Sequence, residues 1–192
     1  MSNEIAVMRI KLKDTHIPIR RWIEIDPNIS LHEFHEIIQT VMGWGNYHLY
    51  GFFVGEHSYF PEDAEMDFGN KISKIEETNL KDILNITKKF SYEYDFGDSW
   101  EHEIVLNRYV DKKEGVNYPR CVAAKGMCPP EDIGGVWGYA RFLDETQWKN
   151  PTEEYLETIE HYGYSLEEIK NVAKEDPDIK EINYTLNSVG YY

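Results

Sequence analysis

The chain has 192 residues, of which 41% are hydrophobic, 14% aromatic and 29% charged. This composition excludes a fibrous or disordered chain, and the length suits a single domain, residues 1–192. Thirty-five acidic residues against twenty lysines and arginines give a formal net charge of −15. Because basic residues that neutralise phosphates supply most non-specific affinity for nucleic acids, this charge argues against direct nucleic-acid binding.

The sequence predicts neither a membrane span nor an export signal. No apolar run approaches the roughly 20 residues that a helix needs to cross a bilayer, and residues 1–4 lack the basic and apolar segments of a signal peptide. We therefore expect a cytoplasmic protein without membrane partners. In that compartment Cys121 and Cys128 are expected to be free thiols, because cytoplasmic proteins keep their cysteines reduced.

The first half of the chain predicts a hairpin, a helix and a strand, in that order. Apolar and polar residues alternate over residues 6–12 and again over 19–25, which is the pattern of two half-buried strands, and residues 14–16 suit the turn between them. A helix follows, and residues 48–54 then predict a buried strand. This order is similar to the start of a β-grasp arrangement.

The helix of this region has a complete set of local signals. Ser30 and Glu33 are spaced as a capping box, and Gly43 is suited to end the helix in the left-handed conformation. One face of the helix is apolar at helical spacing. The apolar residues are Phe34, Ile37, Ile38, Val41 and Met42.

Residues 90–106 predict a second hairpin, because aromatic and aliphatic residues alternate along both of its arms. A three-residue turn at 97–99 would place Tyr94 opposite His102. A slip of one residue would move every side chain to the other face, so the apolar pattern favours this register over a two-residue turn.

The predicted register sets like charges against each other. Asp95 would face Glu101 and Glu93 would face Glu103, an arrangement that destabilises a sheet. Two interpretations follow: the four carboxylates lie apart on a solvated face, or they attract a cation or a basic partner.

From about residue 146 the pattern is helical. Helix starts are predicted at Asn150-Pro151, at Ser165 and at Asp176-Pro177. The chain thus divides into a sheet-rich part, about 1–145, and a helical C-terminal part, about 146–192. The expected fold class is α+β, with a mixed, mainly antiparallel sheet.

Residues suited to chemistry gather in two segments, 92–102 and 128–135. In the first, Asp98 could orient the imidazole of His102 as a general base or a metal ligand. Alternatively, His102 is a core residue with an ordinary hydrogen bond and Asp98 shapes the turn.

In the second segment, two prolines and a glycine pair hold Glu131 and Asp132 in a defined direction. Such a pair could bind a hard divalent cation or a basic group, although Asp132 could instead cap the helix that begins near Val136. The candidate catalytic residues are accordingly His102, Asp98 and Glu131. The candidate ligands of a divalent metal are Asp95, Asp98, His102, Glu131 and Asp132.

The same two segments resemble the plasmid pRiA ORF-3-like family, also described as insertion-element passenger proteins of the TnpR type. The resemblance rests on YEYDFGDSWEH at 92–102 and on CPPEDIGG at 128–135, with Gly138-Tyr139 after it. Weaker matches are Met42-Gly43-Trp44 and HLYGF at 48–52. The resemblance implies an association with plasmids and mobile elements, and the family has no established biochemical activity. Where this chain has Ile133 the family usually has a cysteine, which weakens a thiolate–metal interpretation.

Two functional hypotheses follow. The first is a cytoplasmic interaction or accessory module that binds a protein partner or small ligand where Gly97-Asp98 meets residues 128–135. The second is a metal-dependent hydrolase acting on phosphodiesters, in which one of the acidic or imidazole groups activates water. Both hypotheses require the two segments to converge in space.

Overall fold

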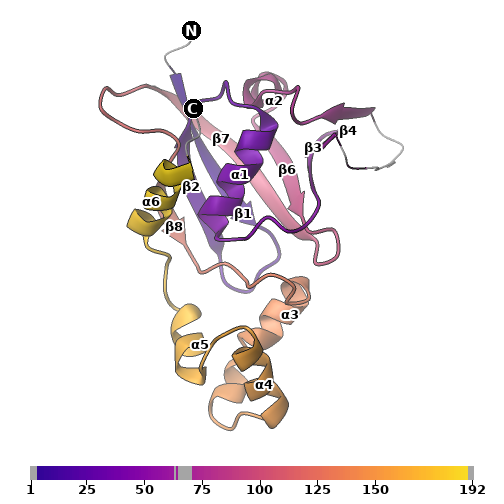
Figure 1. Ribbon diagram of the computed structural model, residues 1–192, viewed down its shortest axis with the longest axis vertical. Helices are drawn as coiled ribbons and strands as arrows, with labels where there is room; N and C mark the ends of the chain where they lie inside the picture. The colour runs from indigo at the N-terminus through magenta and orange to yellow at the C-terminus, as the bar shows by residue number, and fades with distance from the viewer. Residues whose placement is uncertain (1–3, 63, 65–70, 190–192) are drawn as a thin grey trace.

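The computed structural model describes residues 4–62, 64 and 71–189 (Figure 1). Within these residues the strands form a single sheet, and seven helical segments accompany it. The strands are β1 (Glu4–Leu12), β2 (Ile19–Ile25), β3 (Tyr50–Val54), β4 (His57–Phe60), β5 (Lys71–Lys74), β6 (Lys89–Tyr94), β7 (Trp100–Asp111) and β8 (Arg120–Lys125). The helices are α1 (Leu31–Met42), α2 (Leu80–Ile86), α3 (Gly135–Phe142), the 3-10 helix η1 (Glu145–Trp148), α4 (Glu153–His161), α5 (Leu166–Val172) and α6 (Ile179–Val189).

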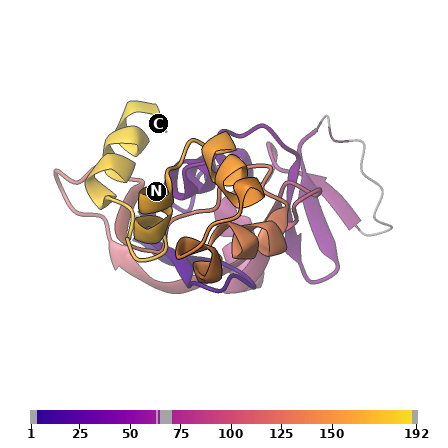
Figure 2. The same ribbon diagram turned by 90° about the horizontal axis from the view of Figure 1, so that it is seen from below.

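The sheet has the strand order β5-β4-β3-β6-β7-β1-β2-β8. Its pairings are antiparallel apart from the parallel pair β4–β5. Helices α1 and α6 lie next to each other on the same face of the sheet, whereas α3, α4 and α5 extend beyond one end of the strands (Figures 1 and 2). The predicted α+β class, the mainly antiparallel sheet and the hairpin-helix-strand start are confirmed.

Helix α1 forms as its local signals predict. The backbone N–H of Glu33 donates to the Ser30 hydroxyl at 3.1 Å, and the Glu33 carboxylate accepts the Ser30 backbone N–H at 2.7 Å. Gly43 ends the helix with φ +91°. The apolar face of α1 is buried against the sheet, where the ring of Phe34 stacks on that of Phe52 at 5.8 Å.

The register of the β6–β7 hairpin differs from the prediction by two residues. Tyr94 pairs with Trp100, and His102 lies opposite Tyr92. The connecting loop has five residues, 95–99, because Asp95 takes a positive φ of 55° and its carbonyl accepts the N–H of Ser99 at 2.6 Å. A shift of two residues leaves every side chain on its predicted face, so the apolar pattern could not separate these two registers.

The charge pairing across this hairpin changes with the register. Glu93 faces Glu101 rather than Glu103, so the predicted opposition of Asp95 to Glu101 was wrong. Basic residues from neighbouring strands pair with the acids on this partly exposed face, as in the contact of 3.0 Å between Arg9 and Glu103. Lys89 also pairs with Glu103, and Lys13 pairs with Glu101. The interpretation of a solvated face describes Glu93, Glu101 and Glu103, whereas Asp95 is buried.

Among the described residues, no helix has the length and apolar character required to span a membrane. Cys121 and Cys128 are both free cysteines, as expected.

Candidate functional site

Three loops from distant parts of the sequence meet where the sheet adjoins α3. We call this region the loop junction and define it as residues 44–49, 95–99 and 128–135. The Trp44 indole donates to the carbonyl of Pro129 at 2.9 Å, and the Asp98 carboxylate accepts the N–H of Gly134 at 3.0 Å. The two segments singled out in the sequence therefore converge, together with a third that follows α1.

A glycine permits the contact between the hairpin loop and the loop before α3. Gly135 has φ +65°, and a Cβ atom at this position would lie 2.5 Å from the backbone carbonyl oxygen of Asp98. Because such a distance is far inside van der Waals contact, residue 135 must lack a side chain for the two loops to touch.

Glu131 links the segments of the junction through hydrogen bonds. One of its carboxylate oxygens accepts the N–H of Gly45 at 2.7 Å, and the other accepts the hydroxyl proton of Tyr94. The Tyr94 oxygen in turn accepts the N–H of Tyr47 at 2.9 Å. Burial and the adjacent Glu131 raise the pKa of Tyr94 far above its usual value, which keeps the phenol protonated as a donor. Glu131, predicted as a ligand or catalyst, is thus engaged in linking three segments.

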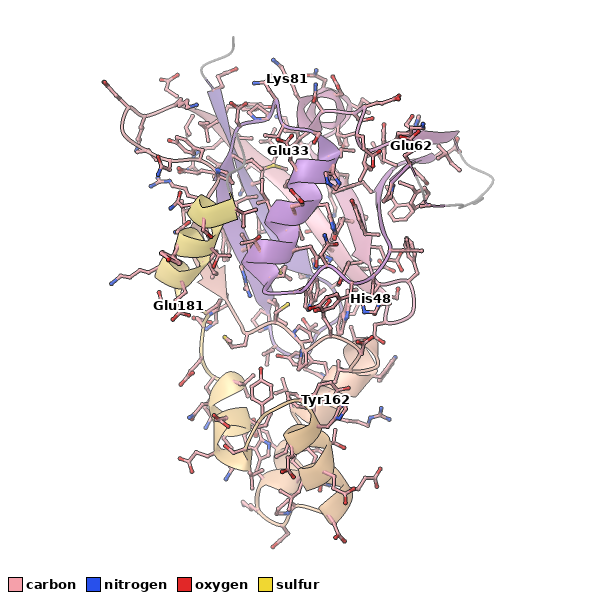
Figure 3. All side chains as sticks on the ribbon, in the orientation of Figure 1. Glu33, His48, Glu62, Lys81, Tyr162 and Glu181 are labelled. Atoms are coloured by element: carbon pink, nitrogen blue, oxygen red, sulfur yellow. The ribbon has the colours of Figure 1, made fainter. Side chains whose placement is uncertain are left out.

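Asp95 and Asp132 converge on a histidine, His48. The His48 Nε2 atom lies 3.2 Å from Asp132 Oδ1 and 3.8 Å from Asp95 Oδ2. One donor atom from each of the three residues lies within 4.8 Å of the other two. The Asp95 side chain is only 10% exposed and that of Asp132 is 71% exposed, so the cluster opens to solvent on the Asp132 side. Figure 3 shows His48 at the end of the sheet that faces the helices.

The chain turns sharply at both acids of this cluster. Asp95 has φ 55° and Asp132 has φ 58°, and Asn46 in the neighbouring loop has φ 59°. Aspartate and asparagine enter this left-handed region more readily than other residues with side chains. Backbone conformations of this kind are concentrated at ligand-binding sites, where the surrounding structure maintains them.

His102 lies in the protein core rather than with the acids. The side chain is completely buried, with the Trp44 ring at 5.4 Å and the Tyr92 ring at 5.3 Å. Burial lowers the pKa of His102 to about 3, so its imidazole is neutral. The backbone at Trp100 and Tyr92 opposes part of that shift, yet neither ring nitrogen forms a well-aligned hydrogen bond within the described part of the chain.

The structure therefore places the predicted pair of Asp98 and His102 differently from the hypothesis. Asp98 directs its carboxylate to the backbone of Gly134, and His102 packs among aromatic rings. Of the five candidate metal ligands, Asp95 and Asp132 share one cluster, whereas Asp98 and Glu131 make hydrogen bonds to other segments of the junction. The alternative interpretation of His102 as a core residue describes its position.

Large hydrophobic side chains are exposed at the junction and on the first turn of α3 next to it. Tyr47 is 80% exposed and Trp137 is 79% exposed, and Leu49 is about half exposed. The Tyr47 ring lies against Gly45, where an added Cβ would come within 2.4 Å of it. Trp137 lines a pocket of about 390 Å³ together with Asp98 and the glycines of both loops.

Sequence reasoning missed His48. No spacing rule connects residue 48 with residues 95 and 132, because each comes from a different loop and only the tertiary fold brings them together. The available signal was the weak family block at 48–52, which begins with this histidine.

The fold and the junction define an α+β protein with one mainly antiparallel sheet and a polar cluster assembled from three loops. The chain belongs to the plasmid pRiA4b ORF-3-like protein family, whose model matches residues 4–175. This confirms the resemblance found in the sequence.

Two relatives resemble the chain over most of its length. It is 34% identical over 170 residues to the uncharacterized protein y4hQ of Sinorhizobium fredii (strain NBRC 101917 / NGR234), covering 83% of this chain and 82% of that protein. It also resembles the crystal structure of MM3350, a protein of unknown function from Methanosarcina mazei Go1. That similarity has a TM-score of 0.78 at 31% identity and covers 94% of this chain and 97% of the other. Neither relative carries a named activity, so the hydrolase hypothesis gains no support from them.

Proposed function

We propose that this chain is a protein-binding module and that the loop junction is its binding surface. The observation that carries the proposal is the exposure of Tyr47, on a loop of the junction, and of Trp137, in the first turn of α3 beside it. Hydrogen bonds lock the loops of the junction together. Exposed aromatic side chains on a rigid support are typical of residues that dominate binding energy. Because the loops are already ordered, a partner would lose little free energy to ordering them on binding.

The charge of the surface favours a partner with basic residues. The chain has a formal net charge of −15, and the pocket beside Trp137 contains Asp14, Asp98 and Glu101 against a single lysine, Lys13. Lysine and arginine side chains bind carboxylates and also stack on tryptophan and tyrosine rings. Complementary charge would in addition accelerate association and make it sensitive to salt.

The proposal treats residues 1–192 as one domain with a cytoplasmic location, and places the binding surface where the sheet meets the helical part. Cys121 and Cys128 as free thiols are consistent with that location.

The test is affinity capture from cells of the source organism, followed by affinity measurement with the purified partner. We expect the double variant Tyr47→Ala, Trp137→Ala to bind the partner at least about tenfold more weakly, since a tenfold change corresponds to about 1.4 kcal/mol. The matched control is Ile86→Ala, Tyr184→Ala, which removes two exposed side chains outside the junction. A partner bound equally by both variants would contradict the proposal, as would capture of no protein above an uncoated matrix.

A further inference from the structure

We infer that His48, Asp95 and Asp132 form a binding site for one divalent transition-metal ion. This inference concerns the surface of the proposed function but does not require a protein partner. It replaces the ligand set suggested by the sequence with one that contains a histidine from the loop after α1. Its basis is the distances, the burial and the donor chemistry of these three side chains.

The distances between the donor atoms suit ligands of one ion. Metal–ligand bonds of roughly 2.1 Å place two ligand atoms about 3.0 Å apart at a right angle and about 4.2 Å apart across the metal. The separations from His48 Nε2 to Asp132 Oδ1 and Asp95 Oδ2, 3.2 and 3.8 Å, lie in this interval. All three donor atoms lie within 4.8 Å of one another. The Asp132 side chain is exposed and can rotate, which would shorten the distance between its carboxylate and that of Asp95.

The environment of His48 Nε2 leaves this nitrogen available to a ligand. The atom is shielded from solvent, yet it forms no well-aligned hydrogen bond with any described residue, despite the two carboxylates beside it. A buried nitrogen without an aligned hydrogen bond costs free energy. An ion bound between the three side chains would satisfy the nitrogen and both carboxylates together.

The surroundings hold the Asp95 carboxylate and the backbone of Asp132 in place. The second oxygen of Asp95, Oδ1, accepts the N–H of Gly97 at 2.9 Å, which fixes the orientation of the carboxylate. The backbone carbonyl of Asp132 accepts the hydroxyl proton of Tyr162 at 2.9 Å, from the helical side of the junction (Figure 3). Interactions of this type outside the ligand shell are usual around metal sites and strengthen binding.

The ligand set selects the class of metal. One imidazole nitrogen with two carboxylate oxygens suits Mn²⁺, Co²⁺ or Zn²⁺, whereas Ca²⁺ takes six to eight oxygen ligands. Three protein ligands leave coordination positions on the solvent side, next to Asp132. A carboxylate or phosphate oxygen of a bound molecule can occupy such a position, which gives this acidic surface a means to bind an anionic group as well.

The experiment is a Mn²⁺ titration of untagged full-length protein after dialysis against EDTA, followed by electron paramagnetic resonance of the free ion. We expect one saturable site per chain, with Zn²⁺ displacing Mn²⁺ because zinc binds nitrogen and oxygen sites more tightly. The variants Asp132→Asn and His48→Gln should each weaken Mn²⁺ binding at least tenfold. The matched control is His32→Gln, which removes the histidine of an exposed pair with Glu36 at 3.8 Å, and it should bind Mn²⁺ as the wild type does.

Co²⁺ absorption provides a second readout that reports the nitrogen ligand. The visible spectrum of the Co²⁺-loaded protein should change in His48→Gln and stay the same in His32→Gln. Absence of saturable Mn²⁺ binding, or equal binding by wild type and Asp132→Asn, would overturn the inference and leave an ion pair at this position. The Asp132 side chain is mostly exposed, so Asp132→Asn should fold normally. Partner capture in EDTA tests the proposed function separately.

Discussion

Two histidines close together in the sequence occupy opposite environments. Helix α1 carries His35 into the core, where its Nδ1 lies 2.8 Å from the Tyr92 hydroxyl and its Nε2 lies 2.7 Å from the Asn46 side-chain oxygen. Burial lowers the pKa of His35 to about 3. The loop after α1 carries His48 to the junction, where its Nε2 faces two carboxylates.

The hydrogen bonds around His35 define where each proton lies. Gln39 donates its side-chain N–H to the Tyr92 oxygen at 3.0 Å, so the Tyr92 hydroxyl donates to His35 Nδ1. His35 Nε2–H then donates to the side-chain oxygen of Asn46, whose backbone N–H donates to the side-chain oxygen of Gln39, Oε1, at 3.2 Å. These hydrogen bonds form a closed ring in which every member is a neutral side chain or a backbone N–H. A histidine satisfied in this way stabilises the fold. His48 is suited to binding, because its Nε2 faces two carboxylates and forms no aligned hydrogen bond with any described residue.

The largest expected effect is on the pH dependence of stability. Burial holds the pKa of both His35 and His102 at about 3. Below about pH 6.5 the unfolded chain therefore takes up protons that the folded chain does not. The free energy of unfolding therefore has its full value above that pH and falls as the pH decreases. The expected loss is about 2 kcal/mol for each histidine between about pH 8 and pH 5. Urea unfolding at several pH values measures this loss.

The variant His102→Leu isolates one of the two contributions. It removes a titrating group, so the loss between pH 8 and pH 5 should be about half that of the wild type. The core histidines would not be the cause if the wild-type stability were constant over this range, or if the variant lost as much as the wild type.

Removal of one phenol hydroxyl tests the buried ring of bonds. Tyr92→Phe leaves His35 Nδ1 and the Gln39 amide without their buried partner, and should lower the free energy of unfolding by about 1–3 kcal/mol. The Mn²⁺ affinity of the folded variant should stay within twofold of wild type, because Tyr92 lies outside the metal cluster. Chemical unfolding and the Mn²⁺ titration measure the two quantities, and a large loss of metal affinity at unchanged stability would contradict this division of roles.

Removing the phenol hydroxyl of Tyr94, two residues further along β6, should have a different effect from removing that of Tyr92. Tyr94→Phe removes the donor to Glu131 at the more accessible junction, so we expect a smaller loss of about 0.5–1.5 kcal/mol. Because Glu131 precedes Asp132 directly, loosening its carboxylate should weaken Mn²⁺ binding several-fold. Our account distinguishes the roles of the core and the junction. It would be contradicted if both variants lost the same free energy of unfolding and kept the Mn²⁺ affinity of the wild type.

The smallest effect is expected on the outer face of the sheet. Arg9→Ala removes one of the two basic partners of Glu103, and Lys89 keeps that carboxylate paired. Both pairs are partly exposed, so the free energy of unfolding should change by less than about 1 kcal/mol, and less again at high salt. If chemical unfolding of Arg9→Ala showed a loss of more than about 2 kcal/mol in the free energy of unfolding, the ion pairs of this face would contribute more than exposed pairs do, contrary to our account.

The parts of the fold that the sequence predicted depend on local patterns. The capping box at Ser30 and the left-handed Gly43 are properties of neighbouring residues, so α1 was placed correctly. The β6–β7 pattern predicted the faces but not the offset, because a shift of two residues preserves every face and the five-residue loop depends on the conformation of Asp95.

The candidate site was only partly predictable for a physical reason. The acids in segments 92–102 and 128–135 stood out through turn residues, and the structure brings these segments together. His48 has no such context, and the pairing of Asp98 with His102 assumed that a hairpin tip folds back over its own strand. Arg21 shows the same limitation, since this buried side chain donates to the carbonyls of Val41 and Gly126 across the fold.

The most direct test of the central claim is an anomalous difference map from crystals soaked in Mn²⁺. Our account predicts one strong peak within roughly 2.0–2.3 Å of His48 Nε2 and of a carboxylate oxygen of Asp95 and Asp132, in the range of bond lengths for such ligands. A map without that peak at saturating Mn²⁺, or with the ion held by Asp98 and Glu131 instead, would contradict it.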